Sequence, residues 1–224
     1  MSPSRLVGLL GHPVSGSLSP RMQNAAFAAS GLDWSYVPID VGLEEFADVA
    51  RALAASGYAG VNVTTPHKLA AAALAEADVP SVNTLVFAAG RIRGFSTDAA
   101  VLEGLGAERP VVLGDGGASV AFQAALPGAR VYARRGEWPP DVSGADLVVN
   151  ATSARDDVLV ELGTGQTLVD LPYPETATAR AARASGASVV GGLDVLVAQG
   201  AAAFELWTGI AAPVEVMRRA VGIA

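Results

Sequence analysis

The stretch Val61–Asp98 decides how the chain is interpreted. It contains VNVTTPHK (61–68), VPSVNT (79–84) and RIRGFSTD (91–98), which are apolar, strand-like runs that end in polar residues. In α/β folds, the groups that contact a ligand gather at the ends of strands. We therefore expect a site built from the polar residues at these ends, namely Thr64, Thr65, Lys68, Asn83, Thr84 and Asp98.

Lys68 stands where stability alone would not place a cation. Thr65-Pro66 predicts a helix start, with a hydroxyl N-cap followed by proline at the first helical position. Lys68 then falls in the first turn, where the helix dipole disfavours a positive charge. With Asp98 as its partner, it would suit proton transfer. The alternative is that Lys68 is a surface lysine near a solvated carboxylate, because most charged side chains are solvated.

The order and spacing of these motifs resemble the shikimate dehydrogenase family. The pattern is N-V-T-x-P-x-K, then V-N-T, then G-F-x-T-D, and further matches extend over nearly the whole chain. The resemblance implies that Lys68 and Asp98 flank the reacting carbon of the substrate. It also implies that Asn83 and Thr64 bind substrate hydroxyls and the carboxylate. The chain departs from the family at Ser96, where relatives usually have asparagine.

Composition limits the class of protein. The 224 residues suffice for one large or two small domains, and 51% of them are hydrophobic. No apolar run approaches the ~20 residues of a membrane helix, and no signal-peptide pattern is visible. The absence of cysteine excludes disulfides, and two histidines, His12 and His67, cannot build a His-rich metal site. The net charge of −7 without a basic cluster argues against nucleic acid. We expect a cytoplasmic protein with a small-molecule substrate and no membrane partner.

The first residues predict a strand followed by an anion site. Residues 5–10 form an apolar run, and Ser19-Pro20 predicts a helix start, with Gly31 at its end. Ser17 and Ser19 match the family's S-x-S-P, in which two hydroxyls hold the substrate carboxylate. A helix N-terminus suits an anion because free backbone N–H groups point at it. The alternative for Ser19 is a helix cap alone. Gln23-Asn24, where the family often has His-Asn, has no explanation in the sequence.

Strands and helices alternate in the first half. Strands over 34–39 and 58–63 flank a helix over 43–56, a βαβ series that predicts a mainly parallel sheet. Runs 82–87 and 91–95 bracket a hairpin turn. A helix capped by Ser96 or Thr97 and running to about Gly106 is expected to link two domains.

The second half begins with a dinucleotide-binding pattern. An apolar strand runs into Gly114-x-Gly116-Gly117-x-Ser119 and then a helix. The next strand ends in Arg134-Arg135, where an acid would contact the ribose of NAD and arginine the 2′-phosphate of NADP. The two arginines predict NADP, and Arg134 matches the family's phosphate-binding arginine. Asp115 is unusual, because a carboxylate facing a pyrophosphate would weaken binding.

The segment GEWPPDVSG (136–144) stands where the fold usually has a helix. Its two prolines and two glycines predict an irregular loop, which would leave one face of the cofactor sheet thinly covered. Downstream, N-A-T-S matches a family segment beside the nicotinamide. Asp170-x-x-Tyr173 resembles a family segment whose tyrosine would bind the substrate carboxylate, and the alternative for Tyr173 is simple packing. Gln199 in G-x-x-x-L-x-x-Q corresponds to a family contact with a substrate hydroxyl, and a buried glutamine needs a partner. Residues 213–221 predict a last helix that packs on the first domain.

Together these observations predict two α/β domains. Residues 1–99 with 193–224 would bind substrate, and residues 100–192 would form a Rossmann-like domain for NADP. The resemblance implies the reversible NADPH-dependent reduction of 3-dehydroshikimate to shikimate, in aromatic amino-acid biosynthesis. A quinate or aminoshikimate dehydrogenase, or a cofactor-binding relative with weak catalysis, stays open, as does a homodimer. The implied cofactor set is Gly114, Gly116, Gly117, Ala118, Ser119, Arg134, Arg135, Asn150, Thr152, Ser153 and Gly192.

Overall fold

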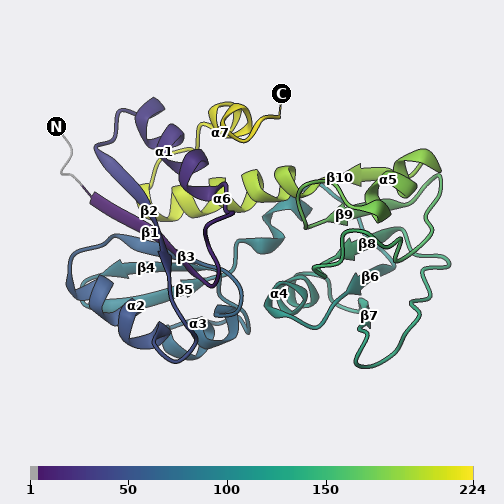
Figure 1. The fold of residues 1–224 in the computed structure, drawn as a ribbon, viewed down its shortest axis with the longest axis horizontal. Coiled ribbons are helices and arrows are strands. Elements are labelled where there is room, and N and C mark those ends of the chain that lie inside the picture. The colour runs from purple at the N-terminus through teal and green to yellow at the C-terminus, as the bar shows by residue number, and fades with distance from the viewer. Residues whose placement is uncertain (1–4, 224) are drawn as a thin grey trace. The chain divides into compact units, whose positions relative to one another are not determined.

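The structure, a computed structural model, describes residues 5–223 (Figure 1). Its residue contacts divide the chain into two compact units. The N-terminal unit holds the described residues up to Thr97 and those from Val197 onward, and the central unit runs from Asp98 to Leu196. Each unit has one five-stranded sheet, and the expected two-part α/β class is confirmed. Among residues 5–223, no helix is long and apolar enough to cross a membrane.

The sheet of the N-terminal unit consists of β1 (Arg5–Gly11), β2 (Trp34–Asp40), β3 (Gly60–Val63), β4 (Thr84–Ala88) and β5 (Arg91–Phe95). The strand order is β2-β1-β3-β4-β5. β1 pairs in parallel with β2 and β3, whereas β4 is antiparallel to β3 and β5. The expected hairpin of β4 and β5 turns at Ala89 and Gly90, both with positive φ, as a two-residue hairpin loop requires. β4 alone therefore runs against the other four strands.

Helices cover both faces of this sheet. The helices of the unit are α1 (Ser19–Ala29), α2 (Phe46–Ala55), α3 (Lys68–Leu74), the part of α6 (Gly192–Thr208) from Val197 onward, and α7 (Val214–Val221). Phe46, Ala50 and Ala71 of α2 and α3 pack with strand residues in one core cluster. On α1 and α6, Phe27 and Phe204 stack with ring centroids 5.4 Å apart. The last helix packs on α1, as the sequence predicted.

The helix α6 lies unusually close to the sheet. The Trp207 indole N–H donates a 3.0 Å hydrogen bond to the carbonyl oxygen of Leu85 in β4. A Cβ atom on Gly60 of β3 would overlap both that carbonyl oxygen and the indole. Nearer the start of α6, a Cβ on Gly200 would overlap the Met22 side chain of α1. Glycine at position 60 is therefore a condition of the close packing, whereas at position 200 the obstacle is only the flexible end of the Met22 side chain.

The central unit has a fully parallel sheet. Its strands are β6 (Pro110–Leu113), β7 (Arg130–Tyr132), β8 (Leu147–Asn150), β9 (Thr167–Asp170) and β10 (Ser188–Val190), in the order β10-β9-β8-β6-β7. The 3₁₀ helix η1 (Asp98–Leu102) and α4 (Gly117–Ala125) lie on one face, where Phe122 packs with Val112 and Val149. The helix α5 (Ala177–Ala184) lies on the other face through Ala179 and Ala182.

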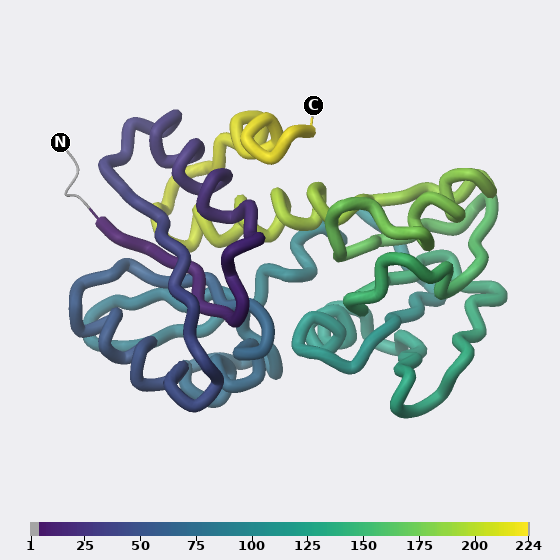
Figure 2. Tube along the Cα trace, in the orientation of Figure 1, coloured from purple at the N-terminus to yellow at the C-terminus, as the bar shows by residue number. Residues whose placement is uncertain are grey.

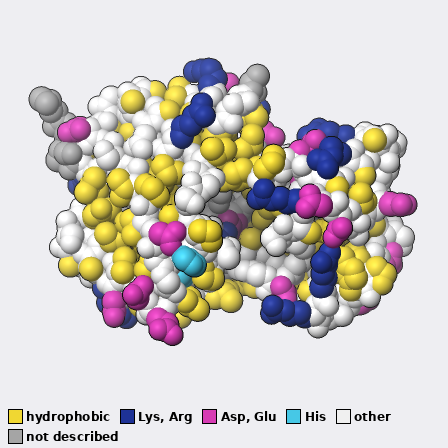
Figure 3. Space-filling model, viewed as in Figure 1, with side chains coloured by type: hydrophobic (Ala, Val, Ile, Leu, Met, Phe, Trp, Pro, Cys, Tyr) yellow, Lys and Arg dark blue, Asp and Glu magenta, His cyan; other side chains and the backbone are white. Residues whose placement is uncertain are grey.

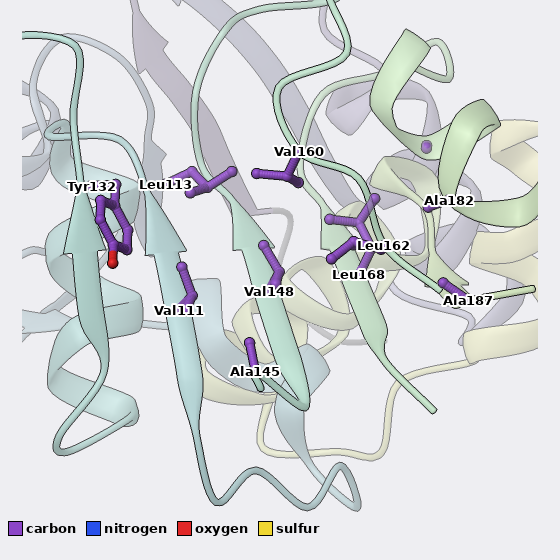
Figure 4. Close-up of a cluster of buried hydrophobic side chains, with 11 residues drawn as sticks. Val111, Leu113, Tyr132, Ala145, Val148, Val160, Leu162, Leu168, Ala182 and Ala187 are labelled. Atoms are coloured by element: carbon purple, nitrogen blue, oxygen red, sulfur yellow. The ribbon is translucent and has the colours of Figure 1, made fainter. Parts of the chain in front are cut away.

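The second face of this sheet is covered partly by loops. Residues 136–144 contain no helix, as predicted, and Figure 2 shows their open path between β7 and β8. Trp138 and Val142 of this loop pack against the cluster on this face. Figure 4 shows Val160 and Leu162, from a second loop, gathered with the strand side chains. A groove of about 780 Å³ remains between these loops, so the covering is thin.

Several helix boundaries differ from the prediction. α3 begins at Lys68, because the Thr64 carbonyl accepts the His67 N–H (2.9 Å) and residues 65–66 form a turn. α1 has Leu18 at its N-cap, so Ser19 is its first residue and not its cap. α2 begins at Phe46 after a turn over 43–45. The linking helix is only the short η1, since a turn with Gly104 at positive φ follows it.

Candidate active site

Both sheets have the same strand order, which fixes where a ligand can bind. In chain order each sheet is 2-1-3-4-5, so the connections that leave strands 1 and 3 turn to opposite sides. In such sheets, ligands bind outside the carboxyl ends of these two strands. In the N-terminal unit these are the ends of β1 and β3, and in the central unit those of β6 and β8. Four of the polar motifs, those with Ser17, Thr64, Gly114 and Thr152, follow these four strands.

In the N-terminal unit, four segments meet at this edge. Gly11 ends β1 and Thr64 follows β3, while Asn83 precedes the antiparallel β4 and Thr97 follows β5. The end of β1 is bonded directly to the segment after β3, because the Thr64 N–H donates to the Leu10 carbonyl oxygen (2.9 Å). The sheet topology thus brings the predicted substrate motifs of this unit to one edge.

Asn83 is the most constrained residue of the edge. Its side chain is 2% exposed, and its Nδ2 donates to Thr97 Oγ1 (3.0 Å) and to Gln199 Oε1 (3.1 Å). Its Oδ1 accepts the Thr97 backbone N–H (2.7 Å). The amide therefore joins the end of β5 to α6. Gln199, predicted to be buried, is partly exposed, and its amide oxygen has a partner within the protein.

Lys68 lies at the start of α3, beside the segment that carries Asn83. Its carbonyl oxygen accepts the Val82 N–H (3.1 Å), and its side chain is partly exposed. It is the single lysine among 15 basic residues of the chain. Asp98 follows Thr97 directly, is the first residue of η1 and is only 4% exposed. By its contacts, Asp98 belongs to the central unit.

His67 is a core residue. It is fully buried, its Nε2 lies 2.8 Å from the Val41 carbonyl oxygen, and its ring stacks on Phe46 with centroids 4.7 Å apart. The stacking and the hydrogen bond hold the turn before α3 against the core. No catalytic role was predicted for it, and its burial suits a structural one.

The loop between β1 and α1 brings Ser17 and Ser19 to the same edge. The His12 N–H donates to the Thr65 carbonyl oxygen (3.0 Å), and Ser17 Oγ accepts the Ser19 N–H (3.2 Å). Both serines and Thr64 are partly exposed. A residue that the sequence did not single out, Asp40, accepts from the Val14 N–H (3.1 Å) and lies 2.5 Å from His12 Nδ1. The His12 hydrogen bond, and next the one from Val14, lower the pKa of Asp40.

Gln23 and Asn24, unexplained by the sequence, hold the fold. Gln23 Nε2 donates to the Gly200 carbonyl oxygen of α6 (2.8 Å), and the side chain is fully buried. Asn24 bonds both the backbone N–H and the carbonyl oxygen of Tyr36 in β2 (2.8 and 3.0 Å). These hydrogen bonds hold α1 against α6 and β2.

In the central unit, the glycine turn follows β6. Gly114 has φ +121°, and a Cβ there would lie 3.1 Å from the Ala151 carbonyl oxygen, so the turn lies tightly against the end of β8. The buried Ser119 Oγ donates to the Gly114 carbonyl oxygen (2.7 Å) and closes the turn. Gly117, Ala118 and Ser119 begin α4, and the first N–H groups of a helix suit an anion. Gly116 is exposed.

The two arginines after β7 already contact acidic side chains. Arg134 Nη2 lies 3.2 Å from Asp157 Oδ2, and its guanidinium lies 5.8 Å from the Trp138 ring centroid. Arg135 Nε lies 4.0 Å from Asp115 Oδ2. These pairs are exposed and are therefore weak. Arg135 nevertheless partly offsets the Asp115 charge beside the glycine turn.

The remaining predicted residues also lie in the central unit. Asn150 is buried, Thr152 is partly exposed and Ser153 is exposed. A Cβ on Gly192, the first residue of α6, would overlap the carbonyl oxygens of Leu171 and Pro172. Tyr173 is partly exposed and belongs to this unit, whereas the other predicted substrate-binding residues lie in the N-terminal unit.

Comparison with known proteins identifies the family. Residues 9–85 match the shikimate dehydrogenase substrate binding domain, and residues 192–221 match the shikimate 5′-dehydrogenase C-terminal domain. A shikimate dehydrogenase (NADP(+)) of Anaeromyxobacter dehalogenans strain 2CP-1 is 40% identical over 265 aligned positions, which cover 96% of this chain and 95% of that protein. The chain belongs to the shikimate dehydrogenase family. The alignment has 265 positions and the chain has 224 residues, so this chain lacks residues that the relative has at internal positions.

Two solved dehydrogenase structures share the fold. Shikimate 5-dehydrogenase from Thermus thermophilus, in complex with NADP(H) and shikimate, matches with a TM-score of 0.82 and 31% identity, over 96% of this chain and 98% of that one. Quinate dehydrogenase from Corynebacterium glutamicum, in complex with NAD, matches with a TM-score of 0.79 and 25% identity, over 97% and 98%.

Proposed function

We propose that the chain catalyses the NADP-dependent, reversible reduction of 3-dehydroshikimate to shikimate, in aromatic amino-acid biosynthesis. The observation that carries the proposal is 40% identity, over nearly the full length of both chains, to a shikimate dehydrogenase (NADP(+)). The polar motifs at the carboxyl ends of β1 and β3 support it, because ligands of such sheets bind there. We also propose the cytoplasm as the compartment of this biosynthetic step.

The proposed chemistry divides between the two units. Residues 1–99 with 193–224 bind the substrate, and residues 100–192 bind NADP. When bound, NADPH supplies the hydride for the ring carbonyl carbon. Lys68 polarises the carbonyl oxygen and delivers its proton, and Asp98 orients the reacting oxygen. In the oxidation direction, Lys68 accepts the proton of the shikimate hydroxyl.

Hydroxyl and amide groups recognise the rest of the substrate. Ser17, Ser19 and Thr64 bind its carboxylate, with the N-terminus of α1 beside them. Asn83 and Gln199 bind ring hydroxyls, and their mutual hydrogen bond fixes both amides before the substrate arrives. Tyr173 supplies a further contact to the carboxylate.

The residues of the central unit fit a dinucleotide. The positive φ of Gly114 allows the tight turn, and the start of α4 suits a pyrophosphate. Arg134 and Arg135 would hold the adenosine 2′-phosphate. On the face shown in Figure 3, the Lys and Arg side chains lie scattered among Asp and Glu. Cofactor binding therefore depends on a few local arginines, since the net charge of the chain is −7.

Replacing both Arg134 and Arg135 by glutamine is expected to raise the KM for NADP⁺ roughly ten- to a hundredfold, the worth of one or two charge-assisted hydrogen bonds. The KM for NAD⁺, which has no 2′-phosphate, should change less than about threefold on the same basis. Steady-state kinetics with both cofactors provides the measurement.

The control for this variant is Arg183→Gln, which removes an exposed arginine that pairs with Glu175 (2.9 Å) on α5. It should leave both KM values unchanged. Equal losses for NADP⁺ and NAD⁺ in the double variant would mean that these arginines do not bind the 2′-phosphate.

Shikimate is expected to give a higher kcat/KM than quinate, which tests the proposed function directly. Quinate carries an extra ring hydroxyl, which needs its own partner once buried. The measurement is oxidation of shikimate and of quinate, each with NADP⁺ and with NAD⁺. A higher kcat/KM for quinate with NAD⁺ would assign the chain to the quinate branch instead. The absence of turnover with either substrate would favour the alternative that the chain is a cofactor-binding relative with weak catalysis.

A further inference from the structure

A buried carboxylate, Asp170, lies behind the loop 150–154. Asp170 ends β9 and is paired in register with Asn150, which ends β8. Both side chains are buried, at 1% and 0% exposure. Asn150 Nδ2 donates a 2.7 Å hydrogen bond to Asp170 Oδ1, and Thr176 Oγ1 donates a 2.9 Å hydrogen bond to Asp170 Oδ2. Neither the family motifs nor the proposed mechanism gives Asp170 a role.

The hydrogen bonds continue from Asn150 into the loop. Asn150 Oδ1 accepts both the backbone N–H of Thr152 (3.1 Å) and the Thr152 hydroxyl (2.7 Å). Thr152 Oγ1 in turn accepts the Ala154 N–H (3.2 Å). The conformation of the loop is therefore set by which way the Asn150 amide points.

The charge of Asp170 determines that direction. An ionised carboxylate only accepts hydrogen bonds, whereas an amide has one accepting and one donating end. The Asn150 NH₂ must face Asp170, so its oxygen must face Thr152. Burial raises the pKa of Asp170, while the hydrogen bonds from Asn150 and Thr176 favour the ionised form. With a neutral acceptor-donor group at position 170, the amide could turn over and Thr152 would lose its acceptor.

We propose that Asp170 is a positioning residue for the cofactor: through Asn150 it fixes the loop that carries Thr152 and Ser153. This inference rests on the proposed function, in which that loop contacts NADP. Asp170 touches no ligand itself, because it is buried. It also joins the loop to the start of α5, since Thr176 Oγ1 accepts the Ala179 N–H (3.0 Å) as the helix cap.

The decisive variants are Asp170→Asn and Asp170→Ala. In Asp170→Asn, the new amide has one accepting end for two present donors, Asn150 Nδ2 and Thr176 Oγ1, so at least one of these donors loses its acceptor. In Asp170→Ala both acceptors are absent, so the Asn150 amide is no longer held in one direction.

A matched control is Asp146→Asn. Asp146 precedes β8, at the opposite end of the strand from Asn150, and accepts the backbone N–H groups of Glu108 (2.7 Å) and Arg109 (3.0 Å). It is thus another structural carboxylate of the same sheet without a connection to the loop.

The measurements are the Kd for NADP⁺ by calorimetry without substrate, the KM for shikimate, kcat and the melting temperature. Asp170→Asn is expected to weaken NADP⁺ binding roughly tenfold, the cost of one unsatisfied buried group. Asp170→Ala should weaken NADP⁺ binding at least as much, because both acceptors are gone. The KM for shikimate should stay unchanged in all variants, and Asp146→Asn should lower only the melting temperature.

Wild-type NADP⁺ affinity in Asp170→Asn, or an equal loss in Asp146→Asn, would overturn the inference. If one of the two variants does not fold, the other decides in the same way. If neither folds, hydrogen exchange of the Thr152 amide in the wild-type chain without NADP⁺ decides: protection supports the inference, and exchange at the rate of an open loop contradicts it. A wild-type chain that binds NADP⁺ without oxidising shikimate would refute the proposed function and leave this comparison intact.

Discussion

Replacing Lys68 by methionine is expected to lower kcat by roughly 10²- to 10⁴-fold, the contribution of a positioned acid or base. The side chain acts as the substrate oxygen gains or loses its proton, so its loss is felt mainly in the transition state. The KM for shikimate should change far less, and the affinity for NADP⁺ should stay the same. Steady-state kinetics and a melting curve measure these quantities.

Lys68→Arg separates charge from proton transfer. Arginine keeps the positive charge but does not give up a proton in proteins, so this variant should be nearly as slow as Lys68→Met. Asp98→Asn should also lower kcat, with some loss of substrate binding. The assignment of Lys68 fails if Lys68→Met retains more than about a tenth of the wild-type kcat, less than that acid/base range.

Replacing Gly60 by alanine is expected to be the most damaging small change to the fold. The added Cβ would overlap the Leu85 carbonyl oxygen and the Trp207 indole, and the backbone of β4 cannot move aside without breaking the sheet. Overpacking of this kind costs about 3 kcal/mol or more. For a chain of this size that corresponds to a fall of roughly 6–12 °C in the melting temperature.

Gly106→Ala is the matched control, because a Cβ there has no neighbour within 4 Å and the backbone is not in the left-handed region. Its effect should lie within about 0.5 kcal/mol of wild type. Equal melting temperatures for Gly60→Ala and wild type would mean that α6 does not pack on β3 and β4 as described.

The strands could be predicted because they are short apolar runs with polar ends. The loop 136–144 could be predicted because proline and glycine are strong local signals. The start of α1 was predicted to within one residue, since Ser19 is its first residue and not its cap. The start of α3 could not be predicted. A hydroxyl-proline pair favours a helix start locally, but the Thr65 carbonyl oxygen accepts the His12 N–H and His67 packs into the core, so contacts from distant parts of the chain shift this boundary.

Some residues of the candidate site could likewise be predicted from the sequence, and others could not. The motifs pointed to Lys68 and Asn83, which stand beside strand ends. Asp40 belongs to no motif, and Asp170 was noted only as the first residue of D-x-x-Y, because their partners lie 28 and 20 residues away and no local pattern shows the contact. The close approach of α6 at Gly60 depends on Trp207, which is farther still. The roles of the site residues and the domain boundaries stay predictions.

Lys68 also gives this protein an unusual spectroscopic property. With no cysteine and a single lysine, the chain has one side-chain amine and no thiol. Reductive ¹³C-methylation would therefore label only Lys68 and the N-terminal amine. The spectrum of the labelled methyl groups would contain signals from these two sites alone, which makes its assignment simple. The protonation of the catalytic candidate could then be followed in solution, with and without shikimate, in the wild-type sequence. Members of the family with many lysines would need each of the others replaced first.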